Sequence, residues 1–299
     1  MAFYRQDPEM ASCLKGILDR LEKEGRPNLQ KNIAITWIRY DNQTPYPTTG
    51  YGTGWNSNKS YYPASIVKIV YAIATQIWLE RDLIVDTEEL RRALYEMISN
   101  SNNDATSYIL DMLTGTTSGP SLSKQNFKAW KFQRQLINNW LKEFQWSELK
   151  SWNCSQKTWN EGPFGREKDF YGKNNENRNS LTSEGIARIF ESLMTNEMIK
   201  GEENENFKKI FQRSLDPVSR KKDLENQVDG FLGEGLPLAS KFWSKAGLMS
   251  EVRHDVAWWK APKKNPTLAV VFTTGKELVR DQFLLPAISS ELNKLAIWQ

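Results

Sequence analysis

The sequence predicts a mixed α/β (α+β) fold: an antiparallel sheet flanked by N- and C-terminal helices, with an all-helical subdomain inserted into it. Strand-like patterns occur near both ends of the chain, helical periodicity dominates the middle, and a helical pattern both begins and closes the sequence. Residues 1–60 and 205–299 are therefore expected to form the sheet subdomain, and residues 61–204 the helical subdomain, with the active site at their interface.

Hydrophobic spacing supports the elements in order. Apolar residues at helical intervals predict a helix over residues 11–24, the apolar run at residues 33–38 predicts a strand, and the prolines and glycines of residues 45–54 predict turns. A strongly apolar helix is expected after Pro63, and residues 145–182 form a long irregular stretch of a kind that is more often functional than idle. Further helices are predicted over residues 87–99, 104–113, 128–144, 183–194 and 281–295, and further strands over residues 239–246, 252–259 and 268–274.

Composition excludes several classes of protein. The 299 residues include 40 Lys and Arg against 36 Asp and Glu, a net charge of +4, so nucleic acid is not an expected partner. One histidine, His254, and two cysteines, Cys13 and Cys154, argue against a zinc site and a disulfide framework, so no metal or cofactor is expected. No apolar stretch approaches the roughly 18 residues of a membrane span. We expect a monomer that is cytoplasmic on the sequence as given, which begins without a signal peptide, and periplasmic or extracellular if a leader was removed.

The strongest candidate for chemistry is Ser65-x-x-Lys68. The same spacing follows four other serines, so the context decides: Pro63 suits a helix start, and the turns that follow are almost wholly apolar. Free N–H groups in the first helical turn favour a developing negative charge at Ser65. Lys68 lies one turn later on the same face, where burial would favour the uncharged amine that can accept the Ser65 proton. The alternative is a capping serine beside a lysine that reaches the surface.

Two other polar groups stand out from their surroundings. Residues 99–106 form a polar run between two apolar helices, in which Ser101 and Asn103 could relay a proton and hold a substrate amide; the alternative is an ordinary helix start. Lys245, at the end of an apolar strand, is followed closely by Gly247, which permits another backbone to approach the strand. The alternative there is an exposed lysine that protects a sheet edge.

In this order, the three groups resemble the three motifs of the penicillin-recognising serine enzymes, most closely the class A β-lactamases. Residues 94–111 also resemble the family's helix–SDN–helix segment, and residues 253–257 resemble its next strand. The resemblance covers most of the chain. It implies a β-lactamase/transpeptidase-like fold and a serine hydrolase that forms an acyl-enzyme with a β-lactam, a related amide or a peptidoglycan-like substrate.

The resemblance also implies a role for each motif residue. Ser65 would be the nucleophile, Lys68 its base, and Ser101 the group that passes a proton to the departing nitrogen. Asn103 would bind the substrate's side-chain amide, and Lys245 would attract the substrate carboxylate.

Residues around the third motif would complete the substrate site. The backbone N–H groups of Ser65 and Leu248 would form an oxyanion hole, and Ala246 and Gly247 would line the substrate beside Leu248. Ala246 replaces the hydroxyl residue usual in this motif and so removes one hydrogen bond to a carboxylate, for which Arg253 would compensate.

Other departures from the family bear on turnover. Asn102 replaces the middle aspartate of the second motif, and the interval of 36 residues from Ser65 to Ser101 is short for the family. The family's ExxLN loop, whose glutamate activates the water that releases the acyl group, has no clear counterpart. Glu161 and Glu167 lie in about the region of the chain where the family has this loop, and Glu161 is the candidate for the base. The alternative is that both are solvated loop charges.

These departures keep other activities open. A DD-peptidase or esterase could use the same scaffold. A penicillin-binding sensor that deacylates slowly or not at all, or a protein that binds without reacting, would also fit the sequence.

Overall fold

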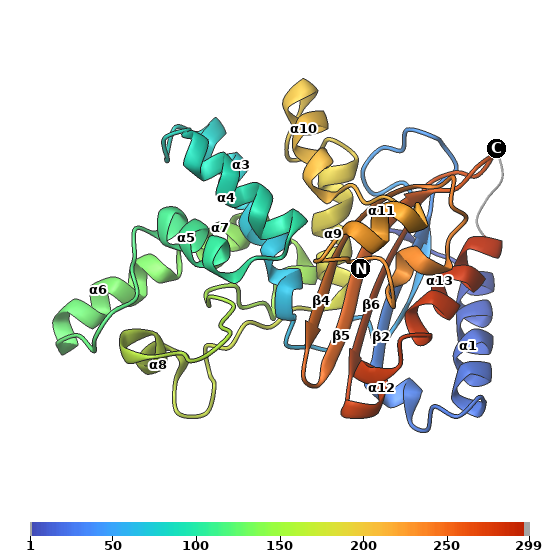
Figure 1. Cartoon of the computed structure of the whole chain (residues 1–299), viewed down its shortest axis with the longest axis horizontal. Helices are drawn as coiled ribbons and strands as arrows, with labels where there is room; N and C mark the ends of the chain where they lie inside the picture. The colour runs from blue at the N-terminus through green and yellow to red at the C-terminus, as the bar shows by residue number, and fades with distance from the viewer. Residues whose placement is uncertain (1, 296–299) are drawn as a thin grey trace. The chain divides into compact units, whose positions relative to one another are not determined.

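A six-stranded sheet with the order β1-β3-β2-β6-β5-β4 forms the centre of the larger part of the protein (Figure 1). The structure is a computed structural model and describes residues 2–295. Neighbouring strands are antiparallel except β1 and β3, which are parallel. The strands are β1 (Arg5–Gln6), β2 (Ile33–Arg39), β3 (Tyr51–Trp55), β4 (Lys241–Met249), β5 (Val252–Lys260) and β6 (Thr267–Thr274). The predicted mixed fold is confirmed.

Contacts divide the chain into two compact units. Met1–Ile66 and Thr182–Gln299 make up the first, here called the sheet unit, and Val67–Leu181 make up the second, the helical unit. The helical unit therefore ends at residue 181 and not at the expected residue 204. The reason is that helix α9 (Ser183–Met194) packs on β2 and β6, where the Ser183 hydroxyl shares a buried 3.0 Å hydrogen bond with a strand threonine.

The sheet unit contains helices as well as strands, whereas the helical unit contains no strand longer than a single bridge among its described residues. Besides α9, the sheet unit has α1 (Pro8–Lys23), α2 (Leu29–Asn32), η1 (Ala64–Ile66), α10 (Gly201–Lys208), η3 (Lys209–Phe211), α11 (Pro217–Lys222), η4 (Leu232–Gly235), α12 (Lys276–Arg280) and α13 (Leu284–Lys294). The helical unit has α3 (Val67–Glu80), α4 (Glu88–Ser99), α5 (Asn103–Thr114), α6 (Lys124–Arg134), α7 (Leu136–Glu143), η2 (Ser147–Leu149) and α8 (Gly165–Tyr171).

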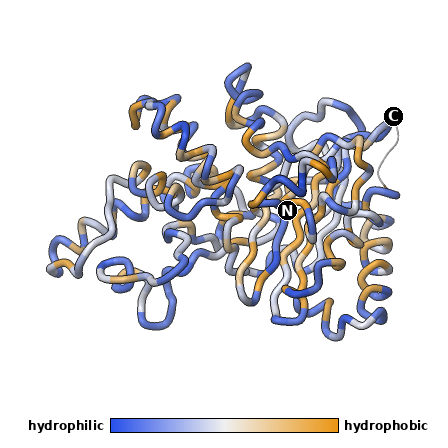
Figure 2. The backbone as a smooth tube through the Cα atoms, viewed as in Figure 1, coloured by the Kyte–Doolittle hydropathy of each residue, from blue (hydrophilic) through white to orange (hydrophobic). Residues whose placement is uncertain are grey.

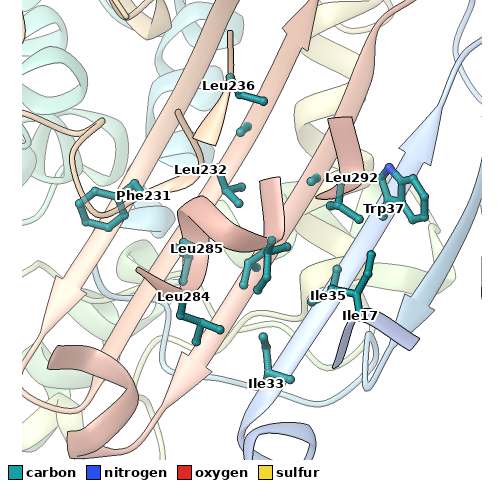
Figure 3. Close-up of a cluster of buried hydrophobic side chains, with 14 of the residues drawn as sticks. Ile17, Ile33, Ile35, Trp37, Phe231, Leu232, Leu236, Leu284, Leu285 and Leu292 are labelled. Atoms are coloured by element: carbon teal, nitrogen blue, oxygen red, sulfur yellow. The ribbon is translucent and has the colours of Figure 1, made fainter. Parts of the chain in front are cut away.

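The main hydrophobic core lies on one face of the sheet. Figure 3 shows Ile33, Ile35 and Trp37, alternate residues of β2, among leucines of α13 and residues of η4. Because side chains alternate along a strand, the residues between them face the other side, where α9 packs. The central strands are consequently buried on both faces. Orange, hydrophobic segments occur along the sheet in Figure 2.

Strand β3 was not predicted, because its glycines indicate turns. The structure shows why glycine is needed in this strand. A Cβ on Gly52 would lie 2.6 Å from the Trp37 carbonyl oxygen, and one on Gly54 would lie 2.5 Å from Ser57 Oγ. These glycines permit close packing of neighbouring backbone and side chains, and they conceal the strand from an analysis based on hydrophobic pattern.

Two parts of the helical unit differ from the prediction. The single helix expected over residues 128–144 is two helices, α6 and α7, that meet at Gln135. The irregular stretch 145–182 contains α8, whose seven residues are too few to produce a readable hydrophobic period. Within residues 2–295, no helix combines the length and the apolar character needed to cross a membrane.

Candidate active site

Ser65 lies in the turn η1, immediately before α3. The residue is partly buried, and its hydroxyl has no hydrogen-bond partner among the described residues. Ala64, directly before it, has a φ of 47°, a left-handed conformation that costs an alanine on the order of 1 kcal/mol. Ile66 N donates a 3.1 Å hydrogen bond to Pro63 O and so closes the turn around Ser65. Such conformations persist where the surrounding structure fixes them, and they are frequent at functional sites.

Strand β4 approaches this turn closely at Gly247. A Cβ on that residue would lie 3.0 Å from Pro63 O and 3.0 Å from Ile66 Cγ1. A side chain there would make the turn shift by a few tenths of an ångström, so glycine permits η1 to pack closely against the strand. The sequence predicted a close approach at this glycine, and the backbone that approaches is the turn that carries Ser65.

Lys245 lies on the same side of β4 as Gly247, two residues earlier. Its side chain is fully buried, which excludes the interpretation as an exposed edge lysine. Lys245 Nζ donates to Gln227 Oε1 at 2.6 Å and to Ala246 O at 2.8 Å. A buried ammonium needs such oxygen partners to offset its lost hydration, so Gln227 is part of the arrangement that holds this lysine.

The outer edge of β4 is mostly occupied by groups of the sheet unit itself. Arg213 N donates to Phe242 O at 2.9 Å, and Ala246 N donates to Gln227 Oε1 at 3.1 Å. Leu248 has the same parity as these strand residues, so its N–H faces the same outer edge, and the residue is 53% exposed. The predicted oxyanion donor is therefore on the open part of the strand.

Two other predicted binding residues are built into the sheet unit. The Ala246 side chain belongs to the hydrophobic core. Arg253 donates from Nε to Val279 O at 2.9 Å and from Nη1 to Gly230 O at 3.1 Å, and its guanidinium lies 5.0 Å from the centre of the Phe231 ring. A role for Arg253 in substrate binding stays a prediction.

In the helical unit, Lys68 is the centre of a buried polar cluster. It lies in the first turn of α3 and is fully buried, so it is not a lysine that extends to the surface. Lys68 Nζ donates to Ser101 O at 2.5 Å, to Ser101 Oγ at 3.3 Å and to Asn103 Oδ1 at 2.8 Å. These three acceptors match the three hydrogens of an ammonium group. The structure therefore brings Lys68 of the first motif into contact with Ser101 and Asn103 of the second.

The polar run at residues 99–106 forms a helix start, and two of its residues also contact Lys68. Asn102 is the N-cap of α5 and accepts a 2.8 Å hydrogen bond from Ala105 N, as a helix start requires. Ser101, with a φ of 54°, and Asn103 contact Lys68 on either side of this cap. The positive φ at Ser101 lets both its carbonyl and its hydroxyl reach the same ammonium.

Asn103 connects the cluster to the irregular stretch of the helical unit. Thr158 Oγ1 donates to Asn103 Oδ1 at 2.8 Å, and Asn103 Nδ2 donates to Asn160 Oδ1 at 2.5 Å. Glu161, the expected base, is exposed and follows directly after Asn160. The side chains that this segment presents to Asn103 are therefore a hydroxyl and a carboxamide.

Glu167 is a buried ion-pair partner, so its interpretation as a solvated loop charge is wrong. Its Oε1 lies 2.7 Å from Arg134 Nη2, with both side chains fully buried, and accepts a 2.9 Å hydrogen bond from Ser118 Oγ. Lys157 Nζ lies 2.7 Å from Asp111 Oδ2 in the same cluster. Burial raises the pKa of Asp111, and Lys157 opposes this shift. The cluster ties the segment that includes Thr158 and Asn160 to α5 and α6.

His254 is a structural residue beside the Ser65 turn. Its Nε2 lies 2.9 Å from Tyr62 O and its Nδ1 accepts a 3.1 Å hydrogen bond from Thr273 N, so the proton is on Nε2. Burial lowers its pKa to about 4. The neutral imidazole thus anchors the segment that leads into η1 and is not available as a base.

The structure adds three residues that the sequence analysis missed. Gln227 contacts Lys245 from 18 positions earlier in the chain, and no pattern in the sequence signals it. Thr158 and Asn160 lie in the region in which the sequence predicts a catalytic base. Glu161 was the predicted base because it has a carboxylate. Among residues 2–295, no group of three or more His, Cys, Asp and Glu side chains could hold a metal ion.

Comparison with solved structures identifies the fold class. The structure is similar to a β-lactamase from Chitinophaga pinensis, with 13% identity and a TM-score of 0.65 over 95% of this chain and 98% of that one. It is similar to a β-lactamase from Sphaerobacter thermophilus, with 16% identity and a TM-score of 0.63 over 95% of each chain. For PBP-A the values are 13% and 0.61, over 97% of this chain and 98% of that one. The protein therefore has the β-lactamase/transpeptidase fold.

Comparison with family models gives the narrower assignment. The model of the Beta-lactamase enzyme family matches residues 86–295, well over half of the chain. The chain belongs to this family, which confirms the resemblance drawn from the motifs. The match includes Ser101, Asn103 and Lys245 and begins after Ser65 and Lys68. No curated protein matches the chain.

The buried His254 predicts a specific dependence of stability on pH. Its pKa is about 4 in the folded state, against the ordinary value of 6.5 for a histidine in the unfolded chain, so the unfolded chain takes up the proton first as the pH falls. The stabilisation is complete above pH 6.5 and is lost as the pH falls towards 4, by about 3 kcal/mol in total. His254→Gln, which cannot titrate here, should lack this component. Urea unfolding of both proteins between pH 7.5 and 4 measures it, and parallel stability curves would contradict the prediction.

The buried ion pair predicts different roles for the two glutamates. Glu167→Gln leaves the buried Arg134 with the longer 3.4 Å ion pair to Asp111 as its charged contact and should lower the free energy of unfolding by about 2 kcal/mol. Glu161→Gln, six residues earlier and exposed, is the matched control and should leave the urea midpoint unchanged. Equal midpoints for the two variants would show that the Arg134–Glu167 pair does not anchor the segment.

Proposed function

We propose that the protein is a Ser-Lys acyl hydrolase that forms an acyl-enzyme at Ser65 with a β-lactam or a related amide. The observation that carries this proposal is the buried Lys68, whose ammonium is held by Ser101 and Asn103. Packing alone does not require a lysine inside an apolar helix. The family membership and the fold support a serine hydrolase in general.

The first step joins Ser65 to the substrate. Ser65 and Lys68 are three residues apart in the continuous helical run of η1 and α3, a spacing that places side chains on one face. The Lys68 ammonium first gives up one proton to solvent, and the neutral amine then takes the hydroxyl proton while Ser65 Oγ attacks the amide carbonyl carbon. The ammonium formed in this way meets the three acceptors described above, which stabilise it at the moment when it appears.

The leaving nitrogen must then be protonated. Ser101 Oγ is 3.3 Å from Lys68 Nζ, so the proton can pass from the ammonium through this hydroxyl to the nitrogen as the C–N bond breaks. The products are an ester at Ser65, a protonated leaving group and a neutral Lys68. Asn103 Nδ2 carries a second hydrogen beyond the one given to Asn160, which can bind a substrate carbonyl oxygen.

Residues of the sheet unit are assigned to substrate binding. The outward N–H of Leu248 and the N–H of Ser65 at the helix start would bind the oxyanion. Gly247 lets η1, the turn that carries Ser65, pack against the strand that carries Lys245. Lys245 would therefore attract the carboxylate of a substrate bound at Ser65. Arg253 stays a candidate for assisting Lys245.

A second candidate function, a penicillin-binding protein that releases its acyl group slowly, is favoured by Asn160. Release requires a base to activate water, and a carboxamide cannot serve as one. The structural neighbours include a leucine-to-glutamate mutant of PBP-A as an acyl-enzyme complex with penicillin G. Comparison of a chromogenic cephalosporin, a D-Ala-D-Ala peptide and a simple ester would separate β-lactamase, DD-peptidase and esterase activity.

The mechanism predicts a covalent penicillin adduct on Ser65. Intact-mass spectrometry after incubation with penicillin G should show one added penicillin on the unmodified protein and none on Ser65→Ala. Ser60→Ala, a nearby exposed serine that follows β3, is the matched control and should be labelled normally. Equal labelling of Ser65→Ala, or an unlabelled native protein, would refute Ser65 as the nucleophile.

The carboxamide at position 160 predicts a long-lived adduct. Asn160→Asp places a carboxylate beside Asn103 and should speed release of the acyl group by about tenfold or more, because the carboxylate can accept a proton from water. Glu161→Gln should leave the adduct lifetime unchanged. Lifetimes are measured by mass spectrometry after excess penicillin is removed. If Glu161→Gln instead prolongs the adduct, Glu161 is the base.

A further inference from the structure

Gln227 places one oxygen atom between two donors of the third motif. Its Oε1 accepts a hydrogen bond from Lys245 Nζ at 2.6 Å and from Ala246 N at 3.1 Å. Gln227 is 5% exposed, and the next residue, Val228, belongs to the hydrophobic core, so this position is part of the folded structure.

The two donors form an arrangement suited to an anion. A cationic ammonium and a backbone N–H that converge on one oxygen bind a carboxylate more strongly than a neutral carboxamide, because charge-assisted hydrogen bonds are roughly twice as strong. The acceptor present here is neutral. The hydroxyl that the resemblance leads one to expect at position 246 is absent, and the Ala246 side chain lies in the core.

We propose that Gln227 is a specificity-determining residue that acts as an internal ligand, its carboxamide oxygen occupying the position of one oxygen of the substrate's carboxylate. An acidic substrate must displace this oxygen from Lys245 and Ala246 N. A substrate without a carboxylate does not compete for these two donors, so Gln227 has little effect on its rate. The inference rests on the proposed function, since it concerns the acid group of the substrate that acylates Ser65.

The test uses variants with opposite expected effects. Gln227→Ala removes the competing oxygen and should raise the second-order rate of Ser65 labelling by penicillin G about tenfold, the equivalent of one hydrogen bond to a charged group. Gln227→Glu supplies a charged internal competitor and should lower that rate about tenfold. Gln212→Ala is the matched control, because Gln212 is exposed and bridges the same edge of β4.

The methyl ester of penicillin G distinguishes competition from damage. Its labelling rate should change less than threefold in every variant, because it has no carboxylate to compete with Gln227. A fall in rate for both Gln227→Ala and Gln227→Glu, or no change in either, overturns the proposal. Changes of equal size for the acid and the ester also overturn it.

An independent measurement does not need acylation. Amide hydrogen exchange should be slow at Ala246 and should become faster in Gln227→Ala, while Gly247, which pairs inward with His254, stays protected. In Gln227→Ala, the free acid should shift the Ala246 amide resonance and the ester should not. If Ser65 is never labelled, the proposed function fails. The shift of the Ala246 amide resonance then decides the role of Gln227, and the absence of that shift overturns the inference.

Discussion

The burial of a lysine ammonium at the start of α3 is the constraint on which the helical unit depends. A charge removed from water must be matched by oxygen acceptors, or the fold loses several kcal/mol. Here the acceptors come from Ser101 and Asn103, which explains why the chain adopts a left-handed conformation at Ser101. Asn103 in turn forms hydrogen bonds with Thr158 and Asn160. The hydrogen bonds that begin at the Lys68 ammonium therefore reach a segment far along the chain.

In the sheet unit, the buried ammonium of Lys245 also needs oxygen acceptors, and one of them comes from a loop. Gln227 supplies that acceptor, Gly247 provides room for η1, and His254 holds the segment before it. Each of these contacts lies within one unit and fixes the groups that it joins in the folded structure. Fixed donors of this kind need little reorganisation during a reaction, which is an important source of rate enhancement in enzymes.

The sequence predicted those parts of the structure that depend on residues close together in the chain. Hydrophobic periods predicted the buried strands and most helices, and the spacing of Ser65 and Lys68 follows from helical geometry. Partners that depend on folding were not predictable: nothing in the sequence relates Gln227 to Lys245, or Glu167 to Arg134. Strand β3 was missed because glycines that permit close packing look like turn residues. Glu161 was chosen for its charge, although the neighbouring Asn160 makes the contact.

The covered edge of β4 also affects how the protein behaves among its own copies. A terminal strand with free backbone groups can recruit a strand from another molecule and start aggregation. Here Arg213 and Gln227 occupy carbonyl and amide groups from Phe242 to Ala246, and the bridge between Gln212 and Trp243 adds to this cover. Leu248, the next residue that faces this edge, is the rung of the described strand left open beyond Ala246. A single rung is too few for a stable intermolecular ladder, so the short open end of β4 discourages polymerisation.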